Sequence, residues 1–474
     1  GVQGYASANL EAIFNADYND NVKVVVQTGG AKRWPNAYIN PNRSQRLLVD
    51  KDGFRIVYDE PLVNMATPES LSDFLTYCTE NYDADHKVVI FWNHGGGVNG
   101  YGWDEIYADK FLSVPELSKA FQDAFGNPGE EPVFEAIGFD ACLMASAEVA
   151  DYLSGYAKYL YASEEIEPGN GWDYQSFLNA LYENPEMNGA QLGKVIADTD
   201  LRFNAESIYV MSESCPGMTF SVVDLSKAPA VYSAYSELAK AELKNVIEDP
   251  AELAAISRAA SKSLAYAGGA YKQYNLFDLT MFMDELPEKY STEAGNVKTA
   301  LDEAVLYARN TYILEGSGGL SVYYPLYSSS VSGLYSSLRF LNDVSKNKDI
   351  NALYYYKLAG CLNDTYKQYL SGNGYAVPET IDFSVMNMLT YTDVECDGTG
   401  NFTLKLDPEM MAVTQNVRFS LAQYDEETGD IEYLGNDAYA YLKEDGTVET
   451  IFGGNWITYG DVYLPLELVS DTSE

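Results

Sequence analysis

The stretch VVIFWNHGGG at residues 88–97 decides the fold class, because an apolar run ends there abruptly in His94 and three glycines. A second run of the same kind, AIGFDACLM at residues 136–144, contains Cys142 close to its end. Short apolar runs of this length are typical of buried strands. In open α/β sheets, functional residues lie just beyond the carboxyl ends of such strands. The two runs therefore predict an α/β sheet with His94 and Cys142 at one edge.

Other strand-like and helix-like segments alternate along the chain around these two runs. Strands are expected at 22–28, 87–92, 136–140, 159–163, 219–223 and 320–324. Helical patterns occupy 68–82, 115–125, 144–154, 174–183 and 188–199. Strands that alternate with helices predict a mainly parallel sheet with helices on both faces.

Two parts of the chain depart from this alternation. Helical patterns at 227–265 and 293–311 predict a helical insertion at about 227–311. Farther along, a stretch rich in glycine, serine and asparagine indicates a linker, and short apolar runs separated by turns follow it. We therefore expect one large α/β domain at 1–370 and a small β-rich domain at 380–474.

The composition describes a folded protein with a strong excess of acidic groups. Of the 474 residues, 46% are hydrophobic and 14% aromatic, so the chain can bury a large core. It carries 70 acidic and 30 basic side chains, which give a formal net charge of -40. This charge opposes binding to nucleic acids and favours cationic ligands. No apolar stretch approaches the roughly 20 residues of a membrane span. We expect neither a nucleic-acid partner nor a membrane span, and the oligomeric state stays open.

The cysteines and histidines of the chain limit the kinds of functional site that it can form. Five cysteines are scattered without the Cys-x-x-Cys spacing of zinc sites, so they predict no metal site. Of the two histidines, His86 lies in a polar stretch and is expected at the surface. His94 and Cys142, each at a strand end, can form the base and the nucleophile of a hydrolase. The alternatives are a structural His94 and a Cys142 that only fills space in the core.

A reaction can be assigned to these residues. The helix expected at 144–154 would place Cys142 at a helix N-terminus, where the dipole favours a thiolate. The thiolate could attack a peptide carbonyl, and His94 could protonate the leaving amine. The backbone N–H groups of Gly95 and Cys142 could bind the oxyanion. The residues thus outline an acyl-transfer site.

Several ordered motifs resemble those of the clostripain family, cysteine peptidases of the clan that also contains caspases, gingipains and legumain. They are VVQTGG at 25–30, NHGGG at 93–97, GFDACLM at 138–144, ASEE at 162–165 and PGNGWDY at 168–174. The resemblance implies a caspase-like fold, a His94/Cys142 dyad without an obligatory third member, and cleavage after arginine or lysine. It also implies a bacterial protein that is secreted or located at the cell surface, with protein or peptide substrates.

Two aspartates are candidates for a pocket that binds the cationic substrate side chain. Asp140 lies two residues before Cys142 on the same predicted strand, so both side chains should project to one face. A carboxylate there could pair with arginine or lysine, although Asp140 could instead only bond to neighbouring backbone. Asp173 is the second candidate, but it precedes a predicted helix, where aspartate is often a cap.

Members of the clostripain family are often made as zymogens that cleave themselves between the catalytic histidine and cysteine. The only basic residues between His94 and Cys142 are Lys110 and Lys119. Lys119 falls within a predicted helix, whereas Lys110 is expected in a loop, where cleavage is easier. The sequence therefore favours self-processing after Lys110.

Cofactors and other classes of function stay open at this stage. Clostripain itself is associated with calcium, but no EF-hand loop appears in the chain, so calcium is possible, no cofactor is required and no metal ligands are assigned. One alternative function is a catalytically inactive caspase-like binding module. Another is a surface-anchored structural protein, which would give no reason for a histidine and a cysteine at paired strand ends.

Overall fold

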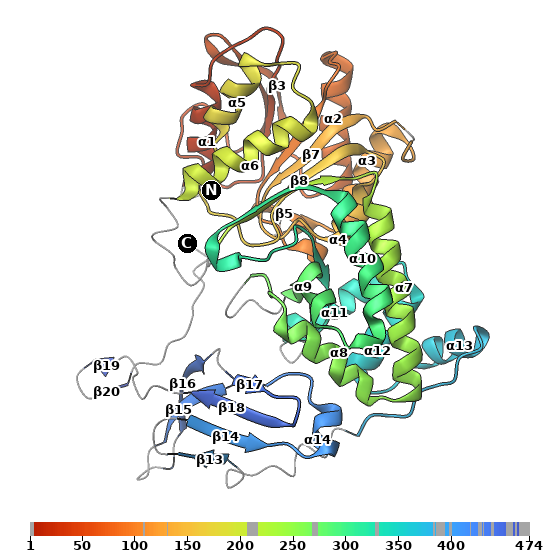
Figure 1. Ribbon diagram of the computed structural model, residues 1–474. Coiled ribbons are helices and arrows are strands. Elements are labelled where there is room, and N and C mark those ends of the chain that lie inside the picture. Colours follow the sequence, from red (N-terminus) through yellow and green to blue (C-terminus); the bar gives the residue numbers. More distant parts are fainter. Residues whose placement is uncertain are drawn as a thin grey trace.

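The computed structural model describes two parts of the chain, which are seen in Figure 1 as a large α/β part and a small β-rich part. The described residues are 4–107, 110–129, 131–205, 217–267, 274–327, 331–382, 384, 394–397, 401–417, 419–424, 429, 431–437, 440–451, 458–459 and 462–463. Within the predicted β-rich domain, residues 385–393 and 464–474 lie outside this description.

The α/β part contains strands β1 to β12 and helices α1 to α13. The strands are β1 (Val25–Thr28), β2 (Arg43–Asp50), β3 (Gly53–Pro61), β4 (Val88–Trp92), β5 (Tyr101–Asp104), β6 (Lys110–Leu112), β7 (Phe134–Asp140), β8 (Ala157–Ala162), β9 (Thr219–Asp224), β10 (Leu276–Asp278), β11 (Val305–Asn310) and β12 (Ser321–Tyr323). The helices are α1 (Tyr5–Phe14), α2 (Pro68–Asn81), α3 (Val114–Phe125), α4 (Ala147–Leu153), α5 (Tyr174–Glu183), α6 (Gly189–Ala205), α7 (Ala228–Glu248), α8 (Ala251–Lys262), α9 (Leu279–Glu285), α10 (Ser291–Ala304), α11 (Val331–Arg339), α12 (Lys348–Ala359) and α13 (Asp364–Gly372).

A five-stranded sheet with the order β11-β9-β8-β7-β4 forms the centre of this part. β4, β7 and β8 are parallel to one another. β9 is antiparallel to β8, and β11 is antiparallel to β9. β11 therefore runs in the same direction as β4, β7 and β8, and β9 alone is reversed within this sheet. The predicted α/β class and the mainly parallel sheet are confirmed.

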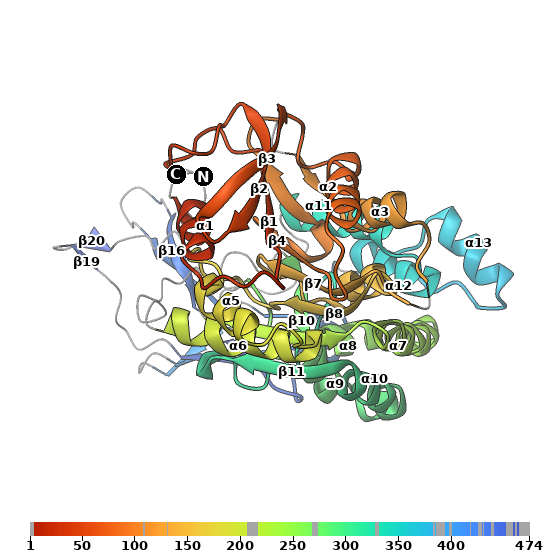
Figure 2. The ribbon, with the colours of Figure 1, turned by 90° about the horizontal axis from the view of Figure 1, so that it is seen from above.

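Alternate residues of the central strands pack on opposite faces of the sheet. Ile137 and Phe139 of β7 belong to a hydrophobic cluster that includes side chains of α2, α3, α4 and α7. Ala136 of the same strand belongs to a second cluster, with side chains of α1, α5 and α6. All residues of β7 are buried, as expected for a strand covered on both faces. Figure 2 shows α5 and α6 on one side of the sheet and α2 and α3 on the other.

The helices on the first face begin at capping residues that are visible in the sequence. The Thr67 side chain accepts a hydrogen bond from the Ser70 N–H at the start of α2. Ser113 and Glu116 form a capping box at the start of α3. Each cap satisfies backbone N–H groups that the helix itself cannot bond. This explains why the predicted helices at 68–82 and 115–125 agree with the structure.

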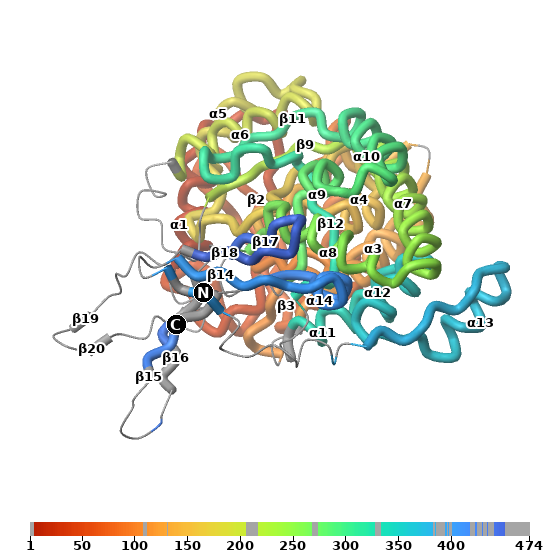
Figure 3. The backbone as a smooth tube through the Cα atoms, turned by 60° about the horizontal axis from the view of Figure 1, so that its bottom comes forward, coloured from red at the N-terminus to blue at the C-terminus, as the bar shows by residue number. Residues whose placement is uncertain are grey.

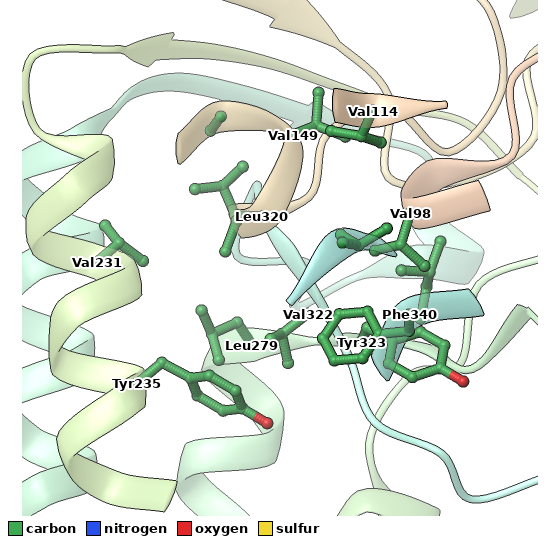
Figure 4. Close-up of a cluster of buried hydrophobic side chains, with 14 of the residues drawn as sticks. Val98, Val114, Val149, Val231, Tyr235, Leu279, Leu320, Val322, Tyr323 and Phe340 are labelled. Carbon is green, nitrogen blue, oxygen red and sulfur yellow. The ribbon is translucent and has the colours of Figure 1, made fainter. Parts of the chain in front are cut away.

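The predicted helical insertion shares its core with the sheet. In Figure 4, Val98 and Val149 approach Leu320, which precedes β12, and Val322 of β12, and Tyr235 comes from α7. All five side chains belong to one buried cluster. The helices α7 to α10 of the insertion therefore pack as a layer of the α/β part.

Three predicted elements differ from the structure. The helix expected at 293–311 ends at Ala304, and the residues after it form β11, an edge strand that covers the free side of β9. β1 does not join the central sheet, because it pairs with β2 in a separate sheet, β1-β2-β3. β12 also lies outside the central sheet and pairs with β10. For β1 and β12 the sequence correctly indicates a strand, but strand partners are chosen by contacts that are distant in sequence. For residues 305–310 the predicted helical conformation is wrong.

The β-rich part contains short strands, as predicted, and also a helix that the sequence pattern did not indicate. It contains β13 (Val394–Cys396), β14 (Asn401–Lys405), α14 (Pro408–Val413), β15 (Phe419–Tyr424), β16 (Ile431–Asp437), β17 (Ala440–Leu442), β18 (Thr447–Ile451), β19 (Thr458–Tyr459) and β20 (Val462–Tyr463). Figure 3 shows α14 next to α8. There, Arg258 of α8 donates hydrogen bonds to the carbonyl groups of Met411 and Thr414, at 3.0 and 2.9 Å. The domain boundaries at 370 and 380 stay a prediction.

Candidate active site

The register of β4 and β7 brings His94 and Cys142 to the same edge of the sheet. The two strands are parallel, and their last residues, Trp92 and Asp140, are paired. His94 and Cys142 each follow two residues later, so their backbones leave the sheet at the same level. The structure thus places both residues at the carboxyl edge that the apolar runs predict.

The loop after His94 packs directly against the Cys142 loop. A Cβ atom on Gly95 would lie 2.0 Å from the carbonyl oxygen of Cys142. This is closer than Cβ atoms come to other heavy atoms in proteins. On Gly97, a Cβ atom would lie 3.1 Å from the carbonyl oxygen of Leu143, and Gly97 has a φ of +57°. Glycine tolerates both conditions because it has no side chain. The glycines therefore let the two loops touch through their backbones.

Gly95→Ala is expected to lower kcat/KM for a cleaved peptide by about 100-fold or more, because about 1 Å of misplacement has this effect on catalysis. The added methyl group must displace the Cys142 carbonyl. Gly295→Ala on α10 is the matched control, since its methyl group would meet nothing within 4 Å. Steady-state kinetics and melting curves of both variants give the result. Full activity of Gly95→Ala would contradict the close packing of the two loops.

Residues 163–167 hold the Cys142 loop from its other side. The Leu143 N–H donates to the Glu165 carbonyl at 3.1 Å. The Glu167 N–H donates to the Sγ atom of Cys142 at 3.3 Å. Leu143 has a φ of +67°, a conformation that is uncommon for residues other than glycine and that clusters at functional sites. The Cys142 sulfur also lies 4.0 Å from the Glu167 carbonyl oxygen, to which the thiol donates. The sequence pattern did not point to this role of Glu167.

The prediction that Cys142 starts a helix is wrong. α4 begins at Ala147, and the Ser146 side chain caps it by accepting a hydrogen bond from the Val149 N–H at 3.2 Å. Cys142 lies four residues before this cap, and the field of a helix falls off within its first turn. The helix dipole therefore does not act on Cys142, and the Glu167 N–H is the backbone donor that bonds to its sulfur.

His94 lies at the surface beside the β5–β6 hairpin. Partial burial lowers the pKa of the imidazole below its usual value, and the charge of Glu105 opposes this shift. A lowered pKa keeps the ring neutral near pH 7, as a general base requires. The rings of His94 and Trp103 are edge to face, with their centroids 6.1 Å apart. The Gly102 N–H donates to the His94 carbonyl at 2.9 Å, which fixes the backbone of the loop.

The backbone hydrogen bonds of this loop pass on either side of Gly95. The Gly96 N–H donates to the Gly100 carbonyl at 2.9 Å, and the Gly102 N–H donates to the His94 carbonyl. The Gly95 N–H takes part in neither bond. An N–H group in this position is available to a ligand oxygen. The oxyanion role of the Gly95 and Cys142 N–H groups stays a prediction.

Asp140 lies beneath the site as a member of a buried acidic group. Its side chain is 5% exposed, and Oδ2 accepts hydrogen bonds from the Trp172 N–H at 3.2 Å and the Tyr174 hydroxyl at 2.9 Å. Burial raises the pKa of Asp140 above its usual value. Burial and the charge of Asp140 also raise the pKa values of Glu167 and Asp200. Among the ion pairs of the described chain, none involves these three carboxyl groups.

With this geometry established, comparison with known proteins identifies the family. The sequence profile of the clostripain family matches residues 1–360. The chain belongs to the clostripain family. Members of this family are cysteine peptidases, in agreement with the resemblance of the sequence motifs.

Individual relatives are distant in sequence but similar in fold. Clostripain of Hathewaya histolytica is 25% identical in an alignment of 328 residues that covers 58% of this chain and 60% of that protein. The match therefore spans less than two thirds of clostripain. A secreted C11 cysteine protease of Bacteroides thetaiotaomicron, solved with an irreversible peptide inhibitor, is 22% identical with a TM-score of 0.53. The alignment covers 72% of this chain and 92% of that one.

A second solved structure supports the same fold. An inactive zymogen C11 protease of Parabacteroides distasonis is 22% identical with a TM-score of 0.51, over 74% of this chain and 94% of that one. The predicted caspase-like fold is thereby confirmed for the clostripain-family part of the chain.

In the described residues, no helix is both long and apolar enough to cross a bilayer.

Asp173 acts as a helix cap. Its Oδ1 atom accepts a hydrogen bond from the Ser176 N–H at 3.1 Å at the start of α5. The capping interpretation of Asp173 is therefore confirmed. Its charge also raises the pKa of Asp200, so Asp173 adjoins the buried acidic group.

The expected loop position of Lys110 is wrong. Lys110 is the first residue of β6, where it is paired with Asp104 of β5. Peptidases bind substrate in an extended, accessible form, so cleavage after Lys110 requires this hairpin to open. Residues 108 and 109, which precede it, lie outside the described chain. Lys119 lies in α3, as predicted, and forms an ion pair with Asp123.

The structure contains no obvious metal centre in the part of the chain that it describes. No group of three or more histidine, cysteine, aspartate or glutamate side chains there could hold a metal ion. Calcium binding by this member of the clostripain family stays a prediction without assigned ligands.

Proposed function

We propose that the protein is a cysteine endopeptidase that cleaves peptide bonds after arginine or lysine, with Cys142 as the nucleophile and His94 as the general acid and base. The observation that carries this proposal is the contact between their loops. The register of β4 and β7 and the approach of Gly95 to the Cys142 carbonyl hold both residues at one edge. A secreted or cell-surface location is part of the proposal and is supported by the relative described as secreted.

The proposed reaction uses groups from the two loops that meet at this edge. His94 accepts the thiol proton, and the Cys142 sulfur bonds to the carbonyl carbon of the substrate. The N–H groups of Gly95 and Cys142 stabilise the oxyanion that forms. As the C–N bond breaks, His94 gives its proton to the leaving amine. His94 then deprotonates a water molecule, which attacks the thioester and releases the thiol and the product acid.

The buried acidic group supports specificity for a cationic residue before the scissile bond. Glu167 links this group to the nucleophile, because its N–H bonds to the Cys142 sulfur and its carboxyl group interacts with Asp140. Carboxyl groups with raised pKa values are poorly stabilised as anions where they lie. An arginine or lysine side chain would stabilise the anions through charge-assisted hydrogen bonds. Asp140 is the central residue of this proposed pocket, with Asp173 at its margin.

Asp140→Asn is expected to lower kcat/KM for peptides with arginine before the scissile bond by about 30- to 100-fold, the loss of about 2–3 kcal/mol for a bond to a charged group. Peptides that carry arginine, lysine, aspartate or alanine at this position should be compared. Glu148→Gln is the matched control, because Glu148 is a buried carboxyl group that bonds instead to the Tyr323 N–H. An equal loss for every cleaved peptide would show that Asp140 only holds the backbone.

Self-processing after Lys110 is a further part of the proposal. It is supported by the position of Lys110 between His94 and Cys142, and it requires the β5–β6 hairpin to open. The paired hairpin also favours the alternative of a catalytically inactive binding protein, which would keep this strand uncut. Absence of turnover with all four peptides would favour that alternative.

A further inference from the structure

Trp103 is a large aromatic side chain that lies exposed beside the proposed catalytic histidine. Its side chain is 48% exposed, although tryptophan is usually well buried. Its ring meets the His94 imidazole edge to face, at 6.1 Å between centroids. An exposed aromatic surface at this place has a free-energy cost that a bound apolar group would remove.

The backbone on both sides of Trp103 is fixed. Asp104 is fully buried, and its carboxylate accepts hydrogen bonds from the N–H groups of Met65, Ile106 and Tyr107, at 2.8, 2.9 and 3.0 Å. The Asn93 side-chain amide donates to the Trp103 carbonyl at 3.3 Å. Hydrogen bonds therefore hold the backbone on both sides of the ring, which is 48% exposed. Tryptophan is common among the residues that anchor binding partners, and a fixed backbone lowers the conformational entropy lost on binding.

The chemistry of the proposed reaction locates the substrate atoms near this ring. His94 must come within hydrogen-bonding distance of the leaving nitrogen to protonate it. That nitrogen belongs to the residue after the scissile bond, and the side chain of this residue branches from the adjacent carbon. The side chain therefore lies close to whatever surrounds the imidazole, and Trp103 is an aromatic neighbour of the imidazole.

We propose that Trp103 forms the subsite for the side chain of the first residue after the scissile bond, and that this subsite favours an aromatic or aliphatic side chain. The inference rests on the proposed function and adds a substrate preference on the leaving-group side. The charge of Glu105, which acts on His94, disfavours an acidic residue at this position. The expected order of kcat/KM is phenylalanine or leucine, then glycine, then aspartate.

The test is cleavage of internally quenched peptides that are identical except for the residue after the scissile bond, which is phenylalanine, leucine, glycine, aspartate or asparagine. Arginine precedes the bond in all of them. For the wild-type protein, kcat/KM should be about 10 times higher for the phenylalanine peptide than for the glycine peptide. This factor corresponds to one apolar contact of about 1–2 kcal/mol. In Trp103→Ala this ratio should fall to about 1, and in Trp103→Phe it should be intermediate.

Tyr335→Ala is the control variant, because Tyr335 is an aromatic side chain that is 64% exposed on α11. It should keep the wild-type ratio. The proposal is overturned if Trp103→Ala lowers kcat/KM equally for all five peptides, or if the ratio does not change. A wild-type preference for asparagine would overturn the apolar character of the subsite. Failure of the wild-type protein to cleave any of the peptides would instead refute the proposed function, and the subsite with it.

Discussion

Cys142→Ala is expected to abolish peptide hydrolysis, with a loss in kcat of at least about 10⁴-fold, as for other nucleophiles that form a covalent intermediate. Alanine has no group that can form the thioester. The loop itself should persist, because the Leu143 N–H bonds to the Glu165 carbonyl through backbone atoms and the contact with Gly95 also involves the backbone. Kinetics with arginine and lysine peptides, together with a melting curve, will separate lost chemistry from lost structure.

Cys361 provides the control for this variant. It is an exposed free thiol, so reagents that alkylate the protein will modify it together with Cys142. Cys361→Ala should keep full activity and should still be inactivated by iodoacetamide.

Intact-mass analysis of the same proteins tests self-processing, since fragments that end at Lys110 should appear in the active protein and be missing in Cys142→Ala. Residual peptide hydrolysis by the Cys142→Ala variant would show that Cys142 is not the nucleophile.

Glu242→Gln is expected to be more favourable for stability at pH 8 than at pH 4. The change in the free energy of unfolding that the substitution causes should be about 3–5 kcal/mol more positive at pH 8. Glu242 lies on α7, is 3% exposed, and burial raises its pKa to about 8. Its Oε1 atom is buried without a hydrogen-bond partner in the described chain. The carboxylate is therefore costly in the folded protein, whereas glutamine is neutral at every pH.

The sign of this effect follows from proton binding. Since the pKa is about 4.3 in the unfolded chain and about 8 in the folded one, the folded protein holds the extra proton between these values. The stabilisation is complete below about pH 4 and is lost as the pH rises through 8. Urea titrations at several pH values should show a shallower pH dependence for Glu242→Gln than for the wild-type protein.

The control for this measurement is Glu237→Gln on the same helix, where the side chain is exposed and paired with Lys240. It should leave the pH dependence nearly unchanged. Glu148 and Glu165, whose pKa values burial raises to about 7, will retain part of the dependence in all these proteins. Equal curves for Glu242→Gln and the wild-type protein would show that Glu242 is solvated when ionised.

The edge of the sheet could be predicted because it depends only on local sequence and strand direction. Two apolar runs that end at His94 and Cys142 suffice to place both residues, since β4 and β7 are parallel. The start of α4 could not be predicted in the same way. Met144 and the residue after it are apolar enough to continue a helix, and the bend at Leu143 depends on a carbonyl group that lies much farther along the chain.

Other parts of the site could not be predicted, because they also depend on contacts between residues that are distant in sequence. Glu167 and Asp200 meet Asp140 only because β8 and α6 pack beside β7, and no spacing in the sequence reports this contact. The strand at Lys110 depends on pairing with Asp104, which the turn composition alone does not indicate. Residues that act through their immediate neighbours are thus visible in the sequence, whereas groups assembled by the fold are not.

The buried cluster in Figure 4 makes the loop after His94 a part of the main core. Val98 lies four residues after His94 and packs in the same cluster as Tyr235 and Tyr323, which come from the helical layer and from β12. Cooperative units in proteins open together when they share buried contacts. The loop after His94 is therefore expected to melt together with the helical layer, so the proposed peptidase activity, followed during heating, would report how intact the centre of the molecule remains.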